Sequence, residues 1–381
     1  MKSSSPAEGA PPLHALAPAI VAGRRYLRAS VADLRATSLR GERARAALRA
    51  TLAIIGSVLL AHLLHLEMPV WAGISALRVF QNDSHATLRR GLERIAGTVA
   101  GVSLGFTIVL AHHHPILVQG AVCLTCGAAL YVQAVSRYSY AFQLVGFTVP
   151  LIVFDGLADP GRVGAIALAR GSEVLVGTAV ATLADAFSRH RQPGPQKPLF
   201  GPLDPAFLGY ALVGGIAVGL VAPLSQLMGR GLTGQASITA FIIVAAAHDG
   251  IGWKSLNRCL GCLLGAALGF AAILLIGHGG APATSPAMWL SWLLFLLITL
   301  FLLEQTDHGG SAIAYTGAQA SLCLLLVLVQ EPIPHLGIAP GLDRLVGIFV
   351  GVALVGLVAL ATWPVRARIK AHFRPLEERD A

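Results

Sequence analysis

Long apolar runs follow one another along almost the whole chain, and they constrain the fold more than any motif does. A bilayer has a hydrocarbon core about 30 Å thick, so a helix that crosses it needs roughly 20 apolar residues. Inside a membrane each segment must satisfy its own backbone polar groups, so the runs predict helices. Twelve segments fit: 48–66, 68–81, 91–111, 115–135, 138–155, 162–187, 206–222, 234–248, 256–277, 286–304, 311–330 and 341–363. We therefore expect an all-α integral membrane protein with about twelve transmembrane helices.

The charged residues support a membrane location and indicate an orientation. Only 12% of the residues are charged, compared with about 25% in a soluble domain. Short cytoplasmic loops retain Lys and Arg, and with the N-terminus inside, only Arg162 and Arg230 fall on the outer side. Arg78, Arg170 and Arg344 fall within segments. Both termini are therefore expected in the cytoplasm, where the net charge of +9 faces anionic membrane lipid; we expect no nucleic-acid partner.

Changes in composition divide the chain into five parts. A basic N-terminal tail, in which Leu27, Val31 and Leu34 recur at helical spacing, predicts a helix on the membrane surface. A stretch rich in Pro, Gly and basic residues separates two hydrophobic halves. The expected parts are the tail 1–47, a first six-helix half 48–187, a cytoplasmic linker 188–205, a second six-helix half 206–363 and a basic cytoplasmic tail 364–381.

An arginine followed by a glycine stripe occurs once in each half. RIAGTVAGVSLGF and RCLGCLLGAALGF align at a constant offset of 164 residues, from Arg94 to Arg258. The matching glycines are Gly97, Gly101 and Gly105 in the first half and Gly261, Gly265 and Gly269 in the second. The match predicts a parallel internal repeat, with the two halves related by a pseudo-two-fold axis along the membrane normal and the substrate path between them.

The stripes themselves have two interpretations. Small residues at every fourth position let helix backbones approach closely, either within one chain or across a homo-oligomer. Since the stripe occurs in both halves, we favour packing within the chain and keep a homodimer as the alternative. Arg94 is interpreted as a charge at the cytoplasmic mouth of its helix that helps to set the topology.

Two blocks of the first half resemble the fusaric acid resistance and aromatic acid exporter family of bacterial inner-membrane transporters. The first is PVWAGISALRVFQNDSHATLRRGLERIAGT, with Trp71, Ala72, Arg90, Gly91, Arg94, Gly97 and Thr98. The second joins YAFQLVGFTVPLI to ALARGSEVLVG, with Tyr140, Gly146, Thr148, Arg170, Glu173 and Gly177. A more distant similarity to plant aluminium-activated malate channels lies in the first block.

The resemblance implies an inner-membrane exporter of aromatic or other weak organic acids, driven by an ion gradient. It also implies a periplasmic adaptor and an outer-membrane channel as candidate partners. The sequence departs from the family in two respects. The linker 188–205 is short where many members carry a large soluble domain, and Arg78 stands where the family is usually apolar.

Arg78 is the first candidate for contact with substrate. A charge inside a membrane segment usually faces a cavity or a partner, and a guanidinium matches a carboxylate in a bidentate way. The alternative is that Arg78 extends from a short helix to the membrane interface. Tyr140 and Gln143, together with Tyr315 and Gln319 of the second half, could stack on and hydrogen-bond an aromatic acid. The alternative for these four is that they hold helices together.

Arg170 and Glu173 lie three residues apart on one helix face, where the carboxylate could exchange the coupling proton or ion. A permanent structural ion pair is the favoured alternative. Cys123 with Cys126, and Cys259 with Cys262, have CxxC spacing within apolar helices, whereas zinc sites usually need loops to wrap the ion; we expect no metal and no cofactor.

No motif for ATP hydrolysis, acyl transfer or metal-dependent hydrolysis occurs, so we do not expect an enzyme. Three functional classes stay open. The favoured class is a secondary exporter of organic acids. The others are a passive organic-anion channel and a membrane scaffold subunit that transports nothing.

Overall fold

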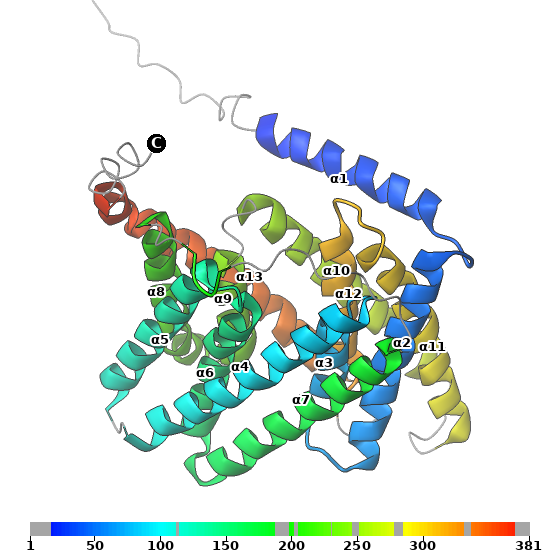
Figure 1. Cartoon of the computed structure of the whole chain (residues 1–381), viewed down its shortest axis with the longest axis horizontal. Coiled ribbons are helices and arrows are strands. Elements are labelled where there is room, and N and C mark those ends of the chain that lie inside the picture. Colours follow the sequence, from blue (N-terminus) through cyan, green and yellow to red (C-terminus); the bar gives the residue numbers. More distant parts are fainter. Residues whose placement is uncertain are drawn as a thin grey trace, which may run out of the picture.

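The computed structural model describes residues 17–111, 114–186, 198–201, 205–229, 231–245, 251–277, 285–330 and 337–369. The described residues fold into helices and contain no β-strand, as expected (Figure 1). The outermost residues of both expected tails and most of the linker 188–205 lie outside this part of the chain.

Thirteen α-helices and one 3-10 turn make up the described structure. In chain order they are α1 Ala17–Ala36, α2 Glu42–Leu63, α3 Val70–Val79, α4 Ser84–Ala111, α5 Pro115–Val135, α6 Ser139–Ala158, η2 Pro160–Arg162, α7 Val163–Asp185, α8 Pro205–Met228, α9 Thr233–Ala245, α10 Ile251–Gly277, α11 Pro286–Asp307, α12 Ala314–Leu328 and α13 Ala339–Ala361. Local sequence explains several boundaries: Pro115 begins α5, and the Ser285 hydroxyl caps α11 by accepting a hydrogen bond from the Met288 amide at 3.2 Å.

Nine of the described helices are long and apolar enough to cross a membrane. Three of the twelve expected spans are shorter: α3 has 10 residues, α9 has 13 and α12 has 15. At 1.5 Å per residue α3 rises only about 15 Å, half the thickness of a hydrocarbon core. By length and composition, nine of the twelve expected segments could thus cross a membrane as full-length helices in the described residues, and the other three form shorter apolar helices.

The glycine stripes lie where helices of the same half touch. A Cβ at Gly97 would collide with the carbonyl oxygen of Ala141 on α6, and one at Gly261 would collide with the carbonyl oxygen of Thr316 on α12. Gly101 and Gly105 continue the first contact, and Gly265 and Gly269 continue the second. The stripes therefore bring α4 against α6 and α10 against α12, within one chain.

Corresponding helices of the two halves make corresponding contacts. α4 packs on α6 and α7 on α3 in the first half, as α10 packs on α12 and α13 on α9 in the second. The halves also exchange contacts: α5 packs on α8 of the second half, and α11 packs on α2 of the first. The parallel repeat stays a prediction, and this pattern is what such a repeat would produce.

Helix α1 lies along one edge of the bundle (Figure 1). It contacts the second half through Tyr26, whose hydroxyl donates to Thr316 Oγ1 at 3.3 Å, and through Arg25, which stacks over the Trp253 ring. Leu27 and Leu34 stay exposed, at 66% and 73%. An exposed apolar face on a basic helix is the feature expected of a helix at a membrane surface.

Candidate functional site

A cavity of about 360 Å³ lies between the two halves. Its walls come from the short helices α3 and α9 and from α4, α5, α6, α10, α12 and α13. Apolar side chains, among them Trp71, Phe147, Leu322 and Leu326, cover part of the wall. Such a surface with a small number of convergent polar groups is typical of a binding site for a small molecule.

The five residues predicted to bind substrate all line this cavity. Arg78 belongs to α3, Tyr140 and Gln143 to α6, and Tyr315 and Gln319 to α12. Residues predicted from the sequence in both halves therefore lie together around one cavity in the tertiary structure. Their role in binding stays a prediction.

The lining is far more basic than the sequence suggested. Besides Arg78, the wall contains Arg90, Arg94, Lys254, Arg258 and Arg344. No Asp or Glu is found among the residues that line the cavity in the described part of the chain. A low-dielectric cavity with several cations and no acid in its wall favours an anion.

Arg94 is one of these buried cations, and its earlier interpretation is wrong. Its side chain is only 3% exposed, and its Nη1 donates to the Tyr140 hydroxyl at 2.7 Å. α4 begins at Ser84 instead of residue 91, so Arg94 lies about 15 Å along the helix and not at its mouth.

Arg258 occupies the corresponding position in α10 and is 1% exposed. Its Nη1 donates to Gln319 Oε1 at 2.8 Å and to the Tyr315 hydroxyl at 3.3 Å. Its Nη2 donates to Thr239 Oγ1 at 3.2 Å. All three partners are uncharged, so the positive charge of Arg258 has no counter-ion among them.

Two further arginines complete the basic wall. The Arg90 guanidinium lies 4.3 Å from the centre of the Tyr140 ring, a cation–π contact. Arg344 on α13 is 2% exposed and donates to Gln235 Oε1 on α9. The two groups that these arginines contact here, the Tyr140 ring and the Gln235 side-chain amide, are uncharged.

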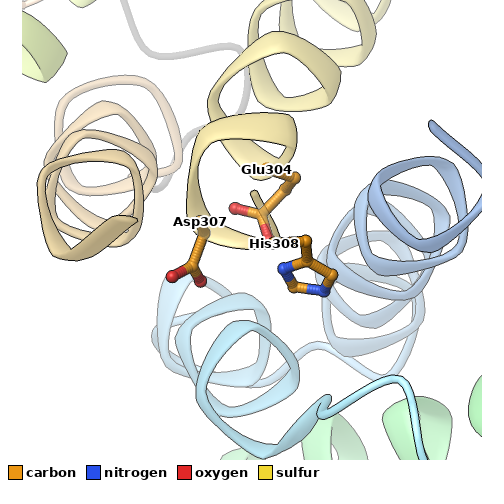
Figure 2. Close-up of side chains that lie close together, drawn as sticks. All are labelled: Glu304, Asp307 and His308. Carbon is orange, nitrogen blue, oxygen red and sulfur yellow. The ribbon is translucent and has the colours of Figure 1, made fainter. Parts of the chain in front are cut away.

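Arg78 differs from its neighbours because carboxylates lie near it outside the cavity wall. Its charge acts on both Glu304 and Asp307, at the end of α11. Figure 2 shows these two side chains together with His308, the residue that follows the helix. Arg94 and Arg258, by contrast, are hydrogen-bonded to uncharged groups.

Glu304, Asp307 and His308 form the one group with metal-ligand spacing in the described residues, their ligand atoms lying within 4.8 Å of one another. Glu304 is fully buried and accepts a hydrogen bond from the Ser321 hydroxyl at 2.6 Å. The His308 ring stacks on Phe80. This donor set suits a divalent cation, but the charge of Arg78 close by opposes one.

The CxxC cysteines do not gather into such a group. Cys126 is buried and its thiol donates to the Gly146 carbonyl, and Cys262 lies against Gln319. Neither pair belongs to the metal-spaced group found in the described residues.

Arg170 and Glu173 do not line the cavity. The Arg170 guanidinium stacks over the Trp71 ring at 4.1 Å, and its nitrogens lie 3.8 Å from Glu173 and 4.0 Å from Asp155. Glu173 is 1% exposed on its side chain and accepts a hydrogen bond from the Met68 amide at 2.8 Å. This is the geometry of the structural ion pair favoured above, while a part in ion coupling stays a prediction.

Fold and site together define a class. The chain is an all-α, multi-pass membrane protein whose helices enclose a basic, partly aromatic cavity at its centre.

Comparisons with known proteins find a family match in the first half of the chain. Residues 43–196 match the model of the Fusaric acid resistance protein family, which confirms the resemblance seen in the sequence. The matched range contains α2 to α7, and with them Arg78, Arg94 and Tyr140 of the cavity.

Curated relatives match over a similar length. The chain is 28% identical over 155 residues to the p-hydroxybenzoic acid efflux pump subunit AaeB of Musicola paradisiaca, a match covering 38% of this chain and 24% of the relative. The protein of the same name from Edwardsiella tarda is 33% identical over 155 residues, with the same coverage. That from Escherichia coli O9:H4 is 29% identical over 160 residues, covering 39% of this chain and 24% of the relative. The matches thus span about a quarter of the length of these relatives. No solved structure matches the chain.

Proposed function

We propose that this protein is a transporter of the bacterial inner membrane that exports aromatic or other weak organic acids. The observation that carries the proposal is the cavity between the halves, with six basic residues and no acid in its described lining. Trp71, Phe147 and the two tyrosines Tyr140 and Tyr315 add aromatic surface to that wall. Guanidinium groups attract a carboxylate, and ring faces suit an aromatic body.

Similarity to efflux pump subunits supports the direction of transport. The relatives are named for p-hydroxybenzoic acid efflux, and the family match covers the first half, including part of the cavity. An export role requires that the substrate enter from the cytoplasm. The positive-inside pattern supports a cytoplasmic location of both termini and the linker, with Arg90 and Lys254 on that side.

The driving force and the assembly belong to the same proposal. The chain has no ATP-hydrolysis motif, so an ion gradient would drive uphill export, with Glu173 and Arg170 as candidate coupling residues. A periplasmic adaptor and an outer-membrane channel would carry the substrate onward. A homo-oligomer is compatible with the exposed apolar helix faces, which also suit lipid.

Flux measurements with the full chain in proteoliposomes test the proposal. Radiolabelled p-hydroxybenzoate and benzoate are the probes, each with and without an imposed proton gradient. The expected result is saturable transport that accumulates the probe against its own gradient when the proton gradient is present. Arg94→Gln should abolish transport, whereas Arg89→Gln, on the same helix but outside the cavity lining, should retain it.

The other two functional classes predict different results. Flux that is saturable but stops at equal concentrations, with or without the gradient, would identify a passive channel. Absence of flux for every anion, with protein that is folded and inserted, would leave the scaffold role and would overturn the transporter.

A further inference from the structure

Two arginine–tyrosine pairs face the cavity from corresponding positions of the two halves. Arg94 on α4 bonds to Tyr140 on α6, and Arg258 on α10 bonds to Tyr315 on α12. In both halves the tyrosine directly precedes the residue whose carbonyl oxygen meets the first glycine of the stripe. The glycine contacts thus hold the two pairs in equivalent settings, both in the wall of one cavity.

Both guanidinium groups have hydrogen-bonding capacity to spare. Each side chain is nine-tenths buried or more, and the Nε of each is buried without a hydrogen-bond partner. A guanidinium offers five N–H donors in a planar fork, of which Arg94 directs one to Tyr140. Within the described residues neither arginine forms an ion pair with a carboxylate. Burying a guanidinium charge without an ion-pair partner costs free energy, and a bound anion would reduce that cost.

The size of the cavity exceeds what a single-ring monoanion needs. A cavity of about 150 Å³ is enough to hold benzene, and this one has about 360 Å³. A benzoate at one pair would therefore leave space beside it, and the guanidinium of the other pair, like those of Arg90 and Arg344, would have no anion.

From these observations we propose that the preferred ligand is an aromatic dianion, with one acidic group at the Arg94–Tyr140 pair and the other at the Arg258–Tyr315 pair. The proposal rests on the transport function proposed above and specifies the substrate class of that same cavity. The aromatic body lies between the pairs, against Phe147 and the other apolar lining residues. The two halves then share one ligand, each neutralising one of its charges.

Calorimetric binding to the purified full chain tests this class. The probes are benzoate, isophthalate and terephthalate, at one pH above the pKa of every carboxyl group and at one ionic strength. We expect at least one dicarboxylate to bind at least tenfold more tightly than benzoate, with one ligand per chain. Dicarboxylates that bind no more tightly than benzoate would overturn the proposal, and so would two benzoates binding per chain with an overall advantage over any dicarboxylate.

Variants of the two arginines sharpen the result. Arg94→Gln and Arg258→Gln should each remove the advantage of the dicarboxylate and bring its affinity to that of benzoate. Arg89→Gln, on α4 but outside the lining, should keep the full advantage. A dicarboxylate advantage that survives both glutamine variants would contradict the assignment of the subsites. The ligand comparison on the unaltered protein stands even where a variant fails to fold.

Failure of this proposal is distinguishable from failure of the transporter. If p-hydroxybenzoate and benzoate bind and are transported but dicarboxylates have no advantage, the dianion class is wrong and the export function stands. If no carboxylate binds or moves, the proposed function fails as well.

Discussion

Arg170 and Arg344 belong to helices that make the same contact in the two halves, yet their surroundings are opposite. Arg170 on α7 has Glu173 and Asp155 within 4.0 Å and the Trp71 ring beneath it. Arg344 on α13 bonds to the neutral Gln235 and lines the cavity. The same contrast separates Arg170 from Arg94 and Arg258. We expect a buried arginine with a carboxylate partner to belong to the scaffold, and one without a counter-ion to be available to a ligand.

The largest expected effect is the loss of stability on breaking the ion pair between Arg170 and Glu173. Arg170→Gln leaves Glu173 buried without its charge partner, which typically costs about 3–5 kcal/mol of stability. Thermal unfolding of the detergent-purified protein should show the loss. The double variant Arg170→Gln/Glu173→Gln should recover most of it, and Arg162→Gln, at an exposed pair with Glu67, should change stability by less than about 1 kcal/mol. Equal stability of the Arg170 variant and the wild type would contradict the scaffold role.

Replacing an arginine that has no counter-ion, such as Arg258, should lower ligand affinity and leave stability unreduced. Arg258→Gln removes charge-assisted hydrogen bonds worth about 1.5–3 kcal/mol to a bound carboxylate, so the affinity for the preferred aromatic dicarboxylate should fall by roughly 10- to 100-fold. Without ligand its thermal stability should equal or exceed that of the wild type, because the lost charge had no counter-ion. Calorimetry and unfolding on the same sample measure both. A large loss of stability with unchanged affinity would make Arg258 structural and would end the contrast with Arg170.

The glycine contacts that hold the arginine–tyrosine pairs in place should be sensitive to a single methyl group. Gly97→Ala forces α4 away from α6 and should cost about 1–3 kcal/mol. Gly171→Ala is the matched control, since a Cβ there would meet nothing within 4 Å, and alanine is the better helix former. Unfolding temperatures of the two variants test this difference. Equal values would mean that the stripe does not determine the α4–α6 contact.

Loss of a tyrosine hydroxyl should give the smallest effect. Tyr140→Phe and Tyr315→Phe each remove one acceptor of an arginine hydrogen bond, a change of about 0.5–1.5 kcal/mol that corresponds to a few-fold to roughly tenfold change in anion affinity. Tyr131→Phe, on α5 and outside the lining, should leave the affinity unaltered. A similar effect of both replacements would show that the two halves contribute alike, and a difference would reveal which half dominates.

Much of the architecture could be predicted from the sequence. Apolar runs located the helices within a few residues in most cases, and the repeated glycines identified helix faces that pack. The search for polar residues within apolar segments found Arg78, Tyr140, Gln143, Tyr315 and Gln319, all of which line the cavity. These inferences succeeded because hydrophobic periodicity and the cost of a buried polar group are properties of short stretches of chain.

The charged wall was underestimated for a physical reason. Arg94 and Arg258 were recognised as the heads of the glycine stripes, but α4 and α10 begin several residues earlier than hydropathy indicates, and both arginines lie inside the protein. The repeat itself carried a usable signal, since an arginine preserved in both halves at the same distance from the packing glycines is positioned by that packing. The interpretation of Arg94 as a residue that sets the topology did not take this signal into account.

The sequence by itself determined that the chain is an all-α membrane protein, that its charged residues are few, and which helix faces pack closely. Only the tertiary structure decided which arginines have counter-ions. Whether an arginine has a counter-ion depends on residues far away along the chain. Arg94 donates a hydrogen bond to Tyr140 and Arg258 donates one to Gln319. Arg78 instead interacts electrostatically with Glu304 and Asp307 of the other half. Helix packing sets these distances, and distance and burial together determine the energy of a charge.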